Sequence, residues 1–197
     1  MFYKIAKAII KPLIYLLYRP RITGMNNLPV KGKTIIYSNH TSLLDPIILG
    51  CVLPRKIHFM AKEELFKIPL ISLLVRNLGA FPVKRGTADI SAVKNALKVL
   101  KNGKVFGIFP EGTRNKTGNI REFSHGIASI AIKSKAPVIP IIIKNGYSLF
   151  KRIDITIGTS VDLEKYYGER ANTELLVNVS SEMEEALRIC AGTGNKI

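Results

Sequence analysis

The sequence predicts a single α/β layered domain with a mostly parallel central sheet flanked by helices. Strand-like apolar runs at 34–38, 105–109 and 137–143 alternate with longer segments of helical periodicity. Such alternation favours a layered α/β fold. The length of 197 residues suits one domain, and neither an internal repeat nor a low-complexity linker is visible. We expect this domain over residues 22–197, after a separate helical segment at 1–21.

The first 18 residues predict an amphipathic helix lying in a membrane interface. Lys4, Lys7 and Lys11 share one helical face, and apolar residues fill the remainder. The lysines keep the apolar run short of the ~20 residues that a spanning helix needs, and Pro12 disfavours one straight helix. No signal-peptide cleavage site is present. We expect the apolar face in the bilayer and the lysines toward anionic headgroups. The alternative is a core-packing helix with a solvated lysine face.

Three further amphipathic helices are predicted in the body of the chain. The first spans 87–102, where Thr87 or Asp89 can cap the start. The second spans 123–135 and the third 172–189. The apolar stripe of the first helix consists of Ile90, Val93, Leu97 and Leu100. The inward face of the last consists of Leu175, Leu176, Val179, Met183 and Leu187.

Two other apolar segments are assigned from their patterns. Ile153, Ile155 and Ile157 alternate with polar residues, which indicates a strand with one covered face. Residues 65–78 are apolar with few charges, and they either line an acyl channel or belong to the core.

A histidine and a carboxylate stand five residues apart in the motif NHTSLLD (39–45), directly after the strand-like run 34–38. On one continuous helix His40 and Asp45 would point about 140° apart. If a helix begins near Ser42, the carboxylate lies in its first turn and can reach a ring nitrogen of His40. That contact would fix the tautomer and leave the other nitrogen free to take a proton. The alternative is a histidine at a helix start with an unrelated acid nearby.

A second polar motif, FPEGTR (109–114), follows the strand-like run 105–109. The planar guanidinium of Arg114 suits a phosphate, Glu111 can orient a hydroxyl, and Gly112 lets backbone approach closely. A third motif, GAFPVKR (79–85), ends in Lys84 and Arg85. In parallel sheets, ligand sites lie beyond the carboxyl ends of the strands. We therefore expect these motifs at one edge of the sheet.

Taken in order, NHTSLLD, GAFPVKR, FPEGTR and APVIPI (136–141) resemble the four sequence blocks of the glycerolipid acyltransferase family, and in particular its bacterial 1-acyl-sn-glycerol-3-phosphate acyltransferase branch. The resemblance covers about residues 30–145 and implies a glycerolipid acyltransferase-like fold. It implies His40 and Asp45 as the catalytic pair, and Pro140 as a residue that shapes the acyl pocket. The substrate-binding residues are then Lys84, Arg85, Glu111, Gly112, Thr113 and Arg114.

The resemblance implies transfer of a fatty acyl group to the sn-2 hydroxyl of lysophosphatidic acid, with acyl-CoA or acyl carrier protein as co-substrate and no metal or other cofactor. Backbone N–H groups near the start of the helix after His40 are the expected oxyanion donors. The alternatives are glycerol 3-phosphate, another lysolipid or an amino-acid-linked lysolipid as acceptor, or a non-catalytic lipid-binding protein at a membrane. Asn115, where many members carry serine, and Ser124-His125-Gly126, where lysine-glycine is usual, bear on acceptor preference.

The charge of the chain is strongly positive and uneven. Residues 1–159 carry 26 Lys and Arg against 7 Asp and Glu, whereas residues 160–197 carry 4 against 7. A basic body favours anionic membranes or phosphorylated ligands. Nucleic acid is not expected as a partner, because no recognised motif, tryptophan or aromatic platform accompanies the basic residues. Two distant cysteines suit a reducing compartment, so we expect a peripheral protein on the cytoplasmic face of the cell membrane.

Overall fold

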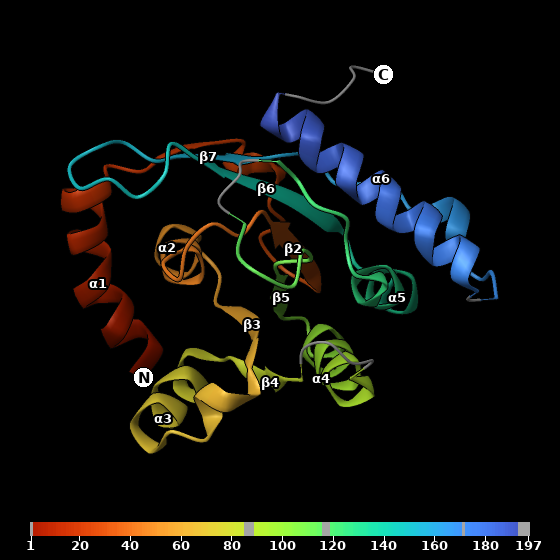
Figure 1. The fold of residues 1–197 in the computed structure, drawn as a ribbon, viewed down its shortest axis with the longest axis horizontal. Coiled ribbons are helices and arrows are strands. Elements are labelled where there is room, and N and C mark those ends of the chain that lie inside the picture. The colour runs from red at the N-terminus through yellow and green to blue at the C-terminus, as the bar shows by residue number, and fades with distance from the viewer. Residues whose placement is uncertain (1, 85–88, 116–118, 171, 193–197) are drawn as a thin grey trace.

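A twisted sheet between two helical layers forms the centre of the computed structural model, which describes residues 2–84, 89–115, 119–170 and 172–192 (Figure 1). In these residues the sheet has seven strands in the order β1-β7-β6-β2-β5-β3-β4. The strands are β1 (Arg21–Thr23), β2 (Thr34–Ser38), β3 (Ile57–Lys62), β4 (Phe81–Val83), β5 (Val105–Ile108), β6 (Val138–Lys144) and β7 (Asp154–Ile157). The β6–β7 pair is antiparallel, and the other paired strands run parallel.

The middle of the sheet consists of β2 between β5 and β6. Ile35 pairs with Phe106 on one side and with Val138 on the other. All five residues of β2 are buried, as are all four of β5. Strands covered on both faces read as continuous apolar runs, which is why both were visible in the sequence. The strand 34–38 has the predicted bounds, and β5 ends one residue before the predicted Phe109.

Helices cover both faces of the sheet (Figure 1). One face carries α4 (Ile90–Lys101), α5 (His125–Ser134) and α6 (Thr173–Ala191), and its core includes Phe106, Ile127 and Met183. The other carries α1 (Phe2–Tyr18) and α2 (Asp45–Val52), over a core that includes Ile36 and Ile139. The remaining helix, α3 (Pro69–Leu78), lies beside α1. Short 3-10 helices occur at Met25–Asn27, Glu63–Phe66 and Glu164–Tyr166.

The helix predicted at 87–102 begins later than expected. Its cap is Asp89, whose carboxylate accepts the Ala92 N–H at 3.0 Å, and Thr87 lies outside the described residues. Ile90 was predicted to face the core but is 69% exposed. The buried face instead follows Ala92, Ala96 and Leu100, because positions four apart share one side of a helix.

The apolar segment 65–78 does not belong to the core, so that alternative is wrong. No residue of α3 is buried, and Leu70 is 82% exposed. The exposed apolar residues of this segment are Ile68, Leu70, Leu73 and Leu74. The acyl-channel alternative stays a prediction.

The N-terminal helix is one element from Phe2 to Tyr18 with Pro12 inside it, where the proline was expected to disfavour one straight helix. Ahead of the proline, the Tyr3 hydroxyl donates to the Gly50 carbonyl of α2 at 2.9 Å. After the proline, Ile14 is buried in the core. These anchors on either side offset the one helical hydrogen bond that proline removes. None of the helices in the described part of the chain is long and apolar enough to cross a membrane.

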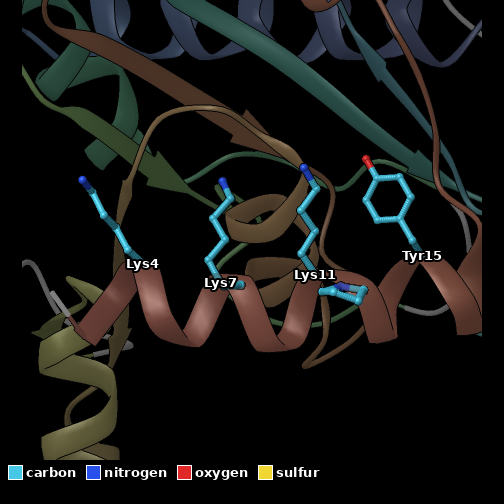
Figure 2. Close-up of a pocket in the computed structure, with 6 residues that line it drawn as sticks. Lys4, Lys7, Lys11 and Tyr15 are labelled. Atoms are coloured by element: carbon cyan, nitrogen blue, oxygen red, sulfur yellow. The ribbon is translucent and has the colours of Figure 1, made fainter.

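The two faces of α1 are clearly separated. Figure 2 shows Lys4, Lys7 and Lys11 pointing to the same side of the helix, toward the body of the protein. There they line a hollow of about 420 Å³, and the Lys7 ammonium donates to the Leu53 carbonyl. The opposite face exposes Phe2, Ile5, Ile9, Leu13 and Leu16. Lys4 and Lys11 are nevertheless exposed and Ile14 is buried in the core, so the position of this helix in a membrane interface stays a prediction.

Candidate active site

The two polar motifs meet because their strands are neighbours. Tyr37 of β2 pairs with Ile108 of β5 in parallel, so the chain leaves both strands at the same edge. His40 follows β2 by two residues, and Glu111 follows β5 by three. This edge, beyond the carboxyl ends of parallel strands, is where open α/β sheets bind ligands.

His40 and Asp45 form a buried pair. The His40 Nδ1 atom lies 2.7 Å from Oδ2 of Asp45, and the exposed fractions of the two residues are 6% and 0%. The same Oδ2 accepts the backbone N–H groups of Thr41 and Ser42 at 2.7 and 2.8 Å. An ionised carboxylate only accepts, so Nδ1 donates and Nε2 keeps its lone pair. The carboxylate thus orients the imidazole as a base.

The local backbone explains how residues five apart can meet. The helix α2 begins at Asp45, three residues after the predicted start at Ser42. The chain between His40 and Asp45 is therefore a turn, which lets the carboxylate at the first helical position reach back. Thr41 and Ser42 give their N–H groups to Asp45. The expectation that backbone N–H groups near the start of α2 stabilise an oxyanion stays a prediction.

Phe109 supports the imidazole from one side. Its ring stacks on His40 with centroids 4.2 Å apart and planes 19° apart. Phe59 of β3 in turn stacks on Phe109 at 5.4 Å. Such contacts restrict how the histidine ring can rotate. Sequence reasoning treated Phe109 as the end of a strand and missed this role, although an aromatic residue directly before Pro-Glu-Gly was a signal.

Glu111 joins the two motif loops. Its Oε1 accepts the backbone N–H of His40 at 3.3 Å, and its Oε2 accepts the amide of Asn115 at 3.0 Å. Asn115 is buried, and its own backbone N–H donates to the His40 carbonyl at 2.6 Å. The residue that sequence reasoning regarded as a departure from the family pattern therefore helps to fix His40.

Asn39 ties the end of β2 to β6. Its side-chain amide donates to the Ile143 carbonyl at 3.0 Å, and its oxygen accepts the Ile143 N–H at 2.9 Å. The side chain thereby replaces a pair of backbone ladder bonds just where β2 ends. Sequence reasoning gave Asn39 no role, although its place directly before His40 could have suggested one.

The predicted phosphate-binding groups lie at the same edge. Thr113 and Arg114 are exposed after β5, and Lys84 is exposed after β4; Arg85 lies outside the described residues. Two strands separate β4 from β2, so Lys84 starts roughly 14 Å from the His40 strand at ~4.8 Å per strand. Of the described groups, Lys84, Thr113 and Arg114 do not hydrogen-bond or ion-pair with His40 or Asp45, so the phosphate-binding role of this set stays a prediction.

Gly112 lies in a tight turn of the loop after β5, and the close backbone approach to substrate predicted for it stays a prediction. Its φ is 71°, and a Cβ atom added there would meet nothing within 4 Å. The left-handed turn, which L side chains rarely adopt, therefore favours glycine at this position.

A cavity of about 960 Å³ adjoins the groups that bind Asp45. Its lining comes from the ends of β2 and β6, the loop after β5 and the end of α6; it includes Thr41, Ser42, Glu111, Asn115 and Tyr147. This volume accommodates a ligand of substrate size.

His58 lies apart from the dyad: its Nδ1 is 2.9 Å from the Gly79 carbonyl, and burial lowers its pKa.

Comparison with known proteins agrees with this arrangement. Residues 19–144 match the family described as Acyltransferase. The chain is 35% identical over 154 residues to the 1-acyl-sn-glycerol-3-phosphate acyltransferase of Bacillus subtilis, across 76% of each protein. It is 34% identical over 143 residues to the protein of that name from Borreliella burgdorferi, across 71% of this chain and 57% of the relative.

The solved structure of a 1-acyl-sn-glycerophosphate acyltransferase from Thermotoga maritima has the same fold. It superimposes with a TM-score of 0.74 at 27% identity, over 98% of this chain and 81% of that one. The family match spans well over half of this sequence, and the Bacillus relative aligns with three quarters of it. On this evidence the chain belongs to the acyltransferase family.

Proposed function

We propose that this protein transfers a fatty acyl group from an acyl thioester to the sn-2 hydroxyl of 1-acyl-glycerol 3-phosphate, forming phosphatidic acid for phospholipid synthesis. The observation that carries the proposal is the His40–Asp45 pair, with Nδ1 bound to a buried carboxylate at 2.7 Å. The names of the Bacillus and Borreliella relatives support this acceptor. The donor is acyl-CoA or acyl carrier protein.

The chemistry proceeds through a tetrahedral intermediate. Nε2 of His40 removes the proton of the acceptor hydroxyl while the oxygen attacks the thioester carbonyl carbon. The carbon–sulfur bond then breaks, and the departing thiolate takes the proton from the imidazolium. The products are an ester and a free thiol, and His40 returns to its neutral form. Asp45 stabilises the imidazolium throughout, because its charge lies against Nδ1.

Acceptor recognition is assigned to the cations at the sheet edge. Arg114 offers a planar fork of donors to the phosphate, with Lys84 and Arg85 as further cations. Glu111 orients the glycerol hydroxyl: each of its oxygens already accepts one protein N–H, and each carboxylate oxygen has a second acceptor site.

The protein is proposed to act at the cytoplasmic face of the membrane as a peripheral protein. The outward face of α1 and the exposed residues of α3 support this, since the two helices lie side by side and large exposed apolar patches mark interaction surfaces. Two free cysteines suit a reducing compartment, and the net charge of +16 suits an anionic leaflet.

Purified protein in detergent, assayed with a panel of acceptors and both donor types, tests the proposal. We expect transfer to 1-acyl-glycerol 3-phosphate above glycerol 3-phosphate and other lysolipids. His40→Ala should lower the rate at least about 10²-fold. The control is Lys133→Ala, which removes an exposed side chain from the last turn of α5. Near-normal turnover by His40→Ala, or preference for another acceptor, contradicts the proposal.

A further inference from the structure

Asp45 accepts a fourth hydrogen bond, and its donor has no part in the proposed chemistry. Oδ2 accepts from His40, Thr41 and Ser42. The other oxygen, Oδ1, accepts the hydroxyl of Tyr147. Tyr147 lies 102 positions away in sequence, in the loop 145–153 between β6 and β7. It also lines the 960 Å³ cavity.

The bond to Tyr147 matters because Asp45 is fully buried. A buried carboxylate oxygen without a donor carries a large desolvation cost. Because both oxygens accept hydrogen bonds, the carboxylate cannot rotate about its Cβ–Cγ bond without breaking one of these hydrogen bonds. The Tyr147 hydroxyl therefore keeps Oδ2 in line with Nδ1 of His40.

The phenol is suited to a donor role. Burial, and next the charge of Asp45, raise the pKa of Tyr147 far above its ordinary value. The hydroxyl thus stays protonated at every working pH and donates to the carboxylate.

The end of α1 fixes Tyr147 in turn. The ring of Tyr18, the last residue of α1, meets the Tyr147 ring edge to face at 5.9 Å and 86°. Two backbone bonds tie the same loop to the helix: Phe150 N–H donates to the Leu17 carbonyl at 2.7 Å, and Ile153 N–H to the Tyr18 carbonyl at 3.0 Å. A continuous set of contacts thus runs from α1 through Tyr147 to Asp45.

We propose that Tyr147 is a positioning residue for the His40–Asp45 pair, and that Tyr18 holds Tyr147 in place. The proposal rests on the proposed function in so far as the pair is the catalytic base. It assigns α1 a second task, because the helix with the exposed apolar face also supports the reacting groups.

The kinetic test is Tyr147→Phe, which removes only the hydroxyl. We expect kcat to fall about 10-fold, as befits loss of one hydrogen bond to a charged group, while KM for the acceptor stays within about 2-fold. Tyr166→Phe is the matched control, since its hydroxyl binds Glu182 at 2.6 Å on the α6 side of the sheet. An unchanged kcat, or a loss confined to KM, overturns the proposal.

A substrate-free measurement separates this proposal from the proposed function. The proton resonance of the His40 ring N–H bound to Asp45 reports the geometry of that bond. We expect it to shift or broaden in Tyr147→Phe and to stay in place in Tyr166→Phe. If the wild type fails to acylate any lysolipid while the resonance still shifts, only the proposed function fails. If the wild type is active and the resonance does not move, the positioning role fails.

A double-mutant cycle tests the contribution of α1. Tyr18→Leu should lower kcat less than Tyr147→Phe, and it should have little further effect in the Tyr147→Phe background. Such non-additivity indicates that Tyr18 acts through the Tyr147 hydroxyl. Independent, multiplying effects of the two changes would contradict the assigned link, provided that circular dichroism shows both variants folded.

Discussion

The backbone N–H of Asn115 donates to the carbonyl of His40 at 2.6 Å. In the opposite direction, the N–H of His40 donates to the side chain of Glu111. His40 is therefore held by both of its backbone polar groups to the loop that follows β5. The loop that contains His40 and the loop that contains Glu111 are one hydrogen-bonded unit, so changes in either loop act on the orientation of the imidazole.

Glu111 should consequently affect the base as well as the acceptor. Glu111→Ala removes the acceptor for His40 N–H and for the Asn115 amide, so kcat should fall at least about 10²-fold. Glu111→Gln keeps one oxygen acceptor and should lose less. Steady-state kinetics with varied acceptor lipid distinguishes the two variants. If Glu111→Ala raised only KM, the carboxylate would serve substrate binding alone.

Arg114 should contribute to acceptor affinity more than to the chemical step. Its side chain is exposed, so Arg114→Ala should raise KM for 1-acyl-glycerol 3-phosphate at least about 10-fold with a smaller change in kcat. Arg114→Lys should recover part of this, because lysine supplies charge without the planar fork.

Lys133→Ala provides the control for Arg114, since it removes an exposed cation from the last turn of α5. The same measurement with an uncharged acceptor should show no difference between Arg114→Ala and the wild type. A kcat loss that is independent of the acceptor phosphate would contradict the phosphate-binding role.

Sequence patterns predicted the parts of the fold that depend on local periodicity. The strand 34–38 was confirmed with its bounds, and the helix predicted at 172–189 occurs at Thr173–Ala191 with Leu175, Val179, Met183 and Leu187 buried as expected. The predicted strand through Ile155 was confirmed as β7. Each of these elements is decided by which residues face a core, and such a pattern is visible within ten to twenty residues.

The errors arose where distant segments decide the outcome. Pro12 was expected to disfavour one straight helix, but Tyr3 and Ile14 of α1 find their partners on α2 and in the core, which no local pattern shows. The His40–Asp45 contact was predicted correctly from spacing, whereas Tyr147 comes from 102 residues further along the chain and gave no sequence signal. Local sequence patterns can therefore predict a contact between residues five apart, but not a contact with a residue such as Tyr147 that comes from a distant loop.

The exposed apolar face of α1 should contribute directly to membrane binding. Ile9 and Leu13 are 62% and 52% exposed, and burying two such side chains is worth roughly 3 kcal/mol or more. Ile9→Glu with Leu13→Glu should therefore lower partition onto anionic vesicles about 10²-fold or more in a flotation assay. Deleting the whole helix is a poorer test, because Ile14 belongs to the core.

The control for these substitutions is Val30→Glu, at a position that is 86% exposed outside both α1 and α3. It adds one of the two negative charges that the double variant adds, and it should leave partition within about 3-fold. Lys4→Glu gives an independent reading: its effect should disappear at high salt, because only the charge of the helix changes. Equal binding by the wild type and the double variant would contradict the membrane role of α1.

The cap of α4 should make a pH-dependent contribution to stability. The Asp89 carboxylate accepts the N–H groups of Lys84 and Ala92 and the hydroxyl of Ser91. These bonds lower the pKa of Asp89 to about 2, and the bond from the Lys84 N–H contributes most. Its folded-state pKa is thus below the ordinary value of 3.8, so the ionised cap stabilises the fold above pH ~4 and loses that contribution as the pH falls toward 2.

Asp89→Ala should therefore cost about 1 kcal/mol at pH 7, the usual value of an N-cap, and lower Tm by roughly 2–4 °C for a chain of this size. At pH 2 the difference in Tm between the wild type and Asp89→Ala should shrink. Asp89→Asn is the matched variant, because asparagine caps without ionising; it should retain most of the stability at pH 7. Thermal unfolding at pH 7 and pH 2 measures all three proteins. A Tm gap between the wild type and Asp89→Ala that is the same at both pH values would show that the charge of Asp89 contributes nothing to the cap.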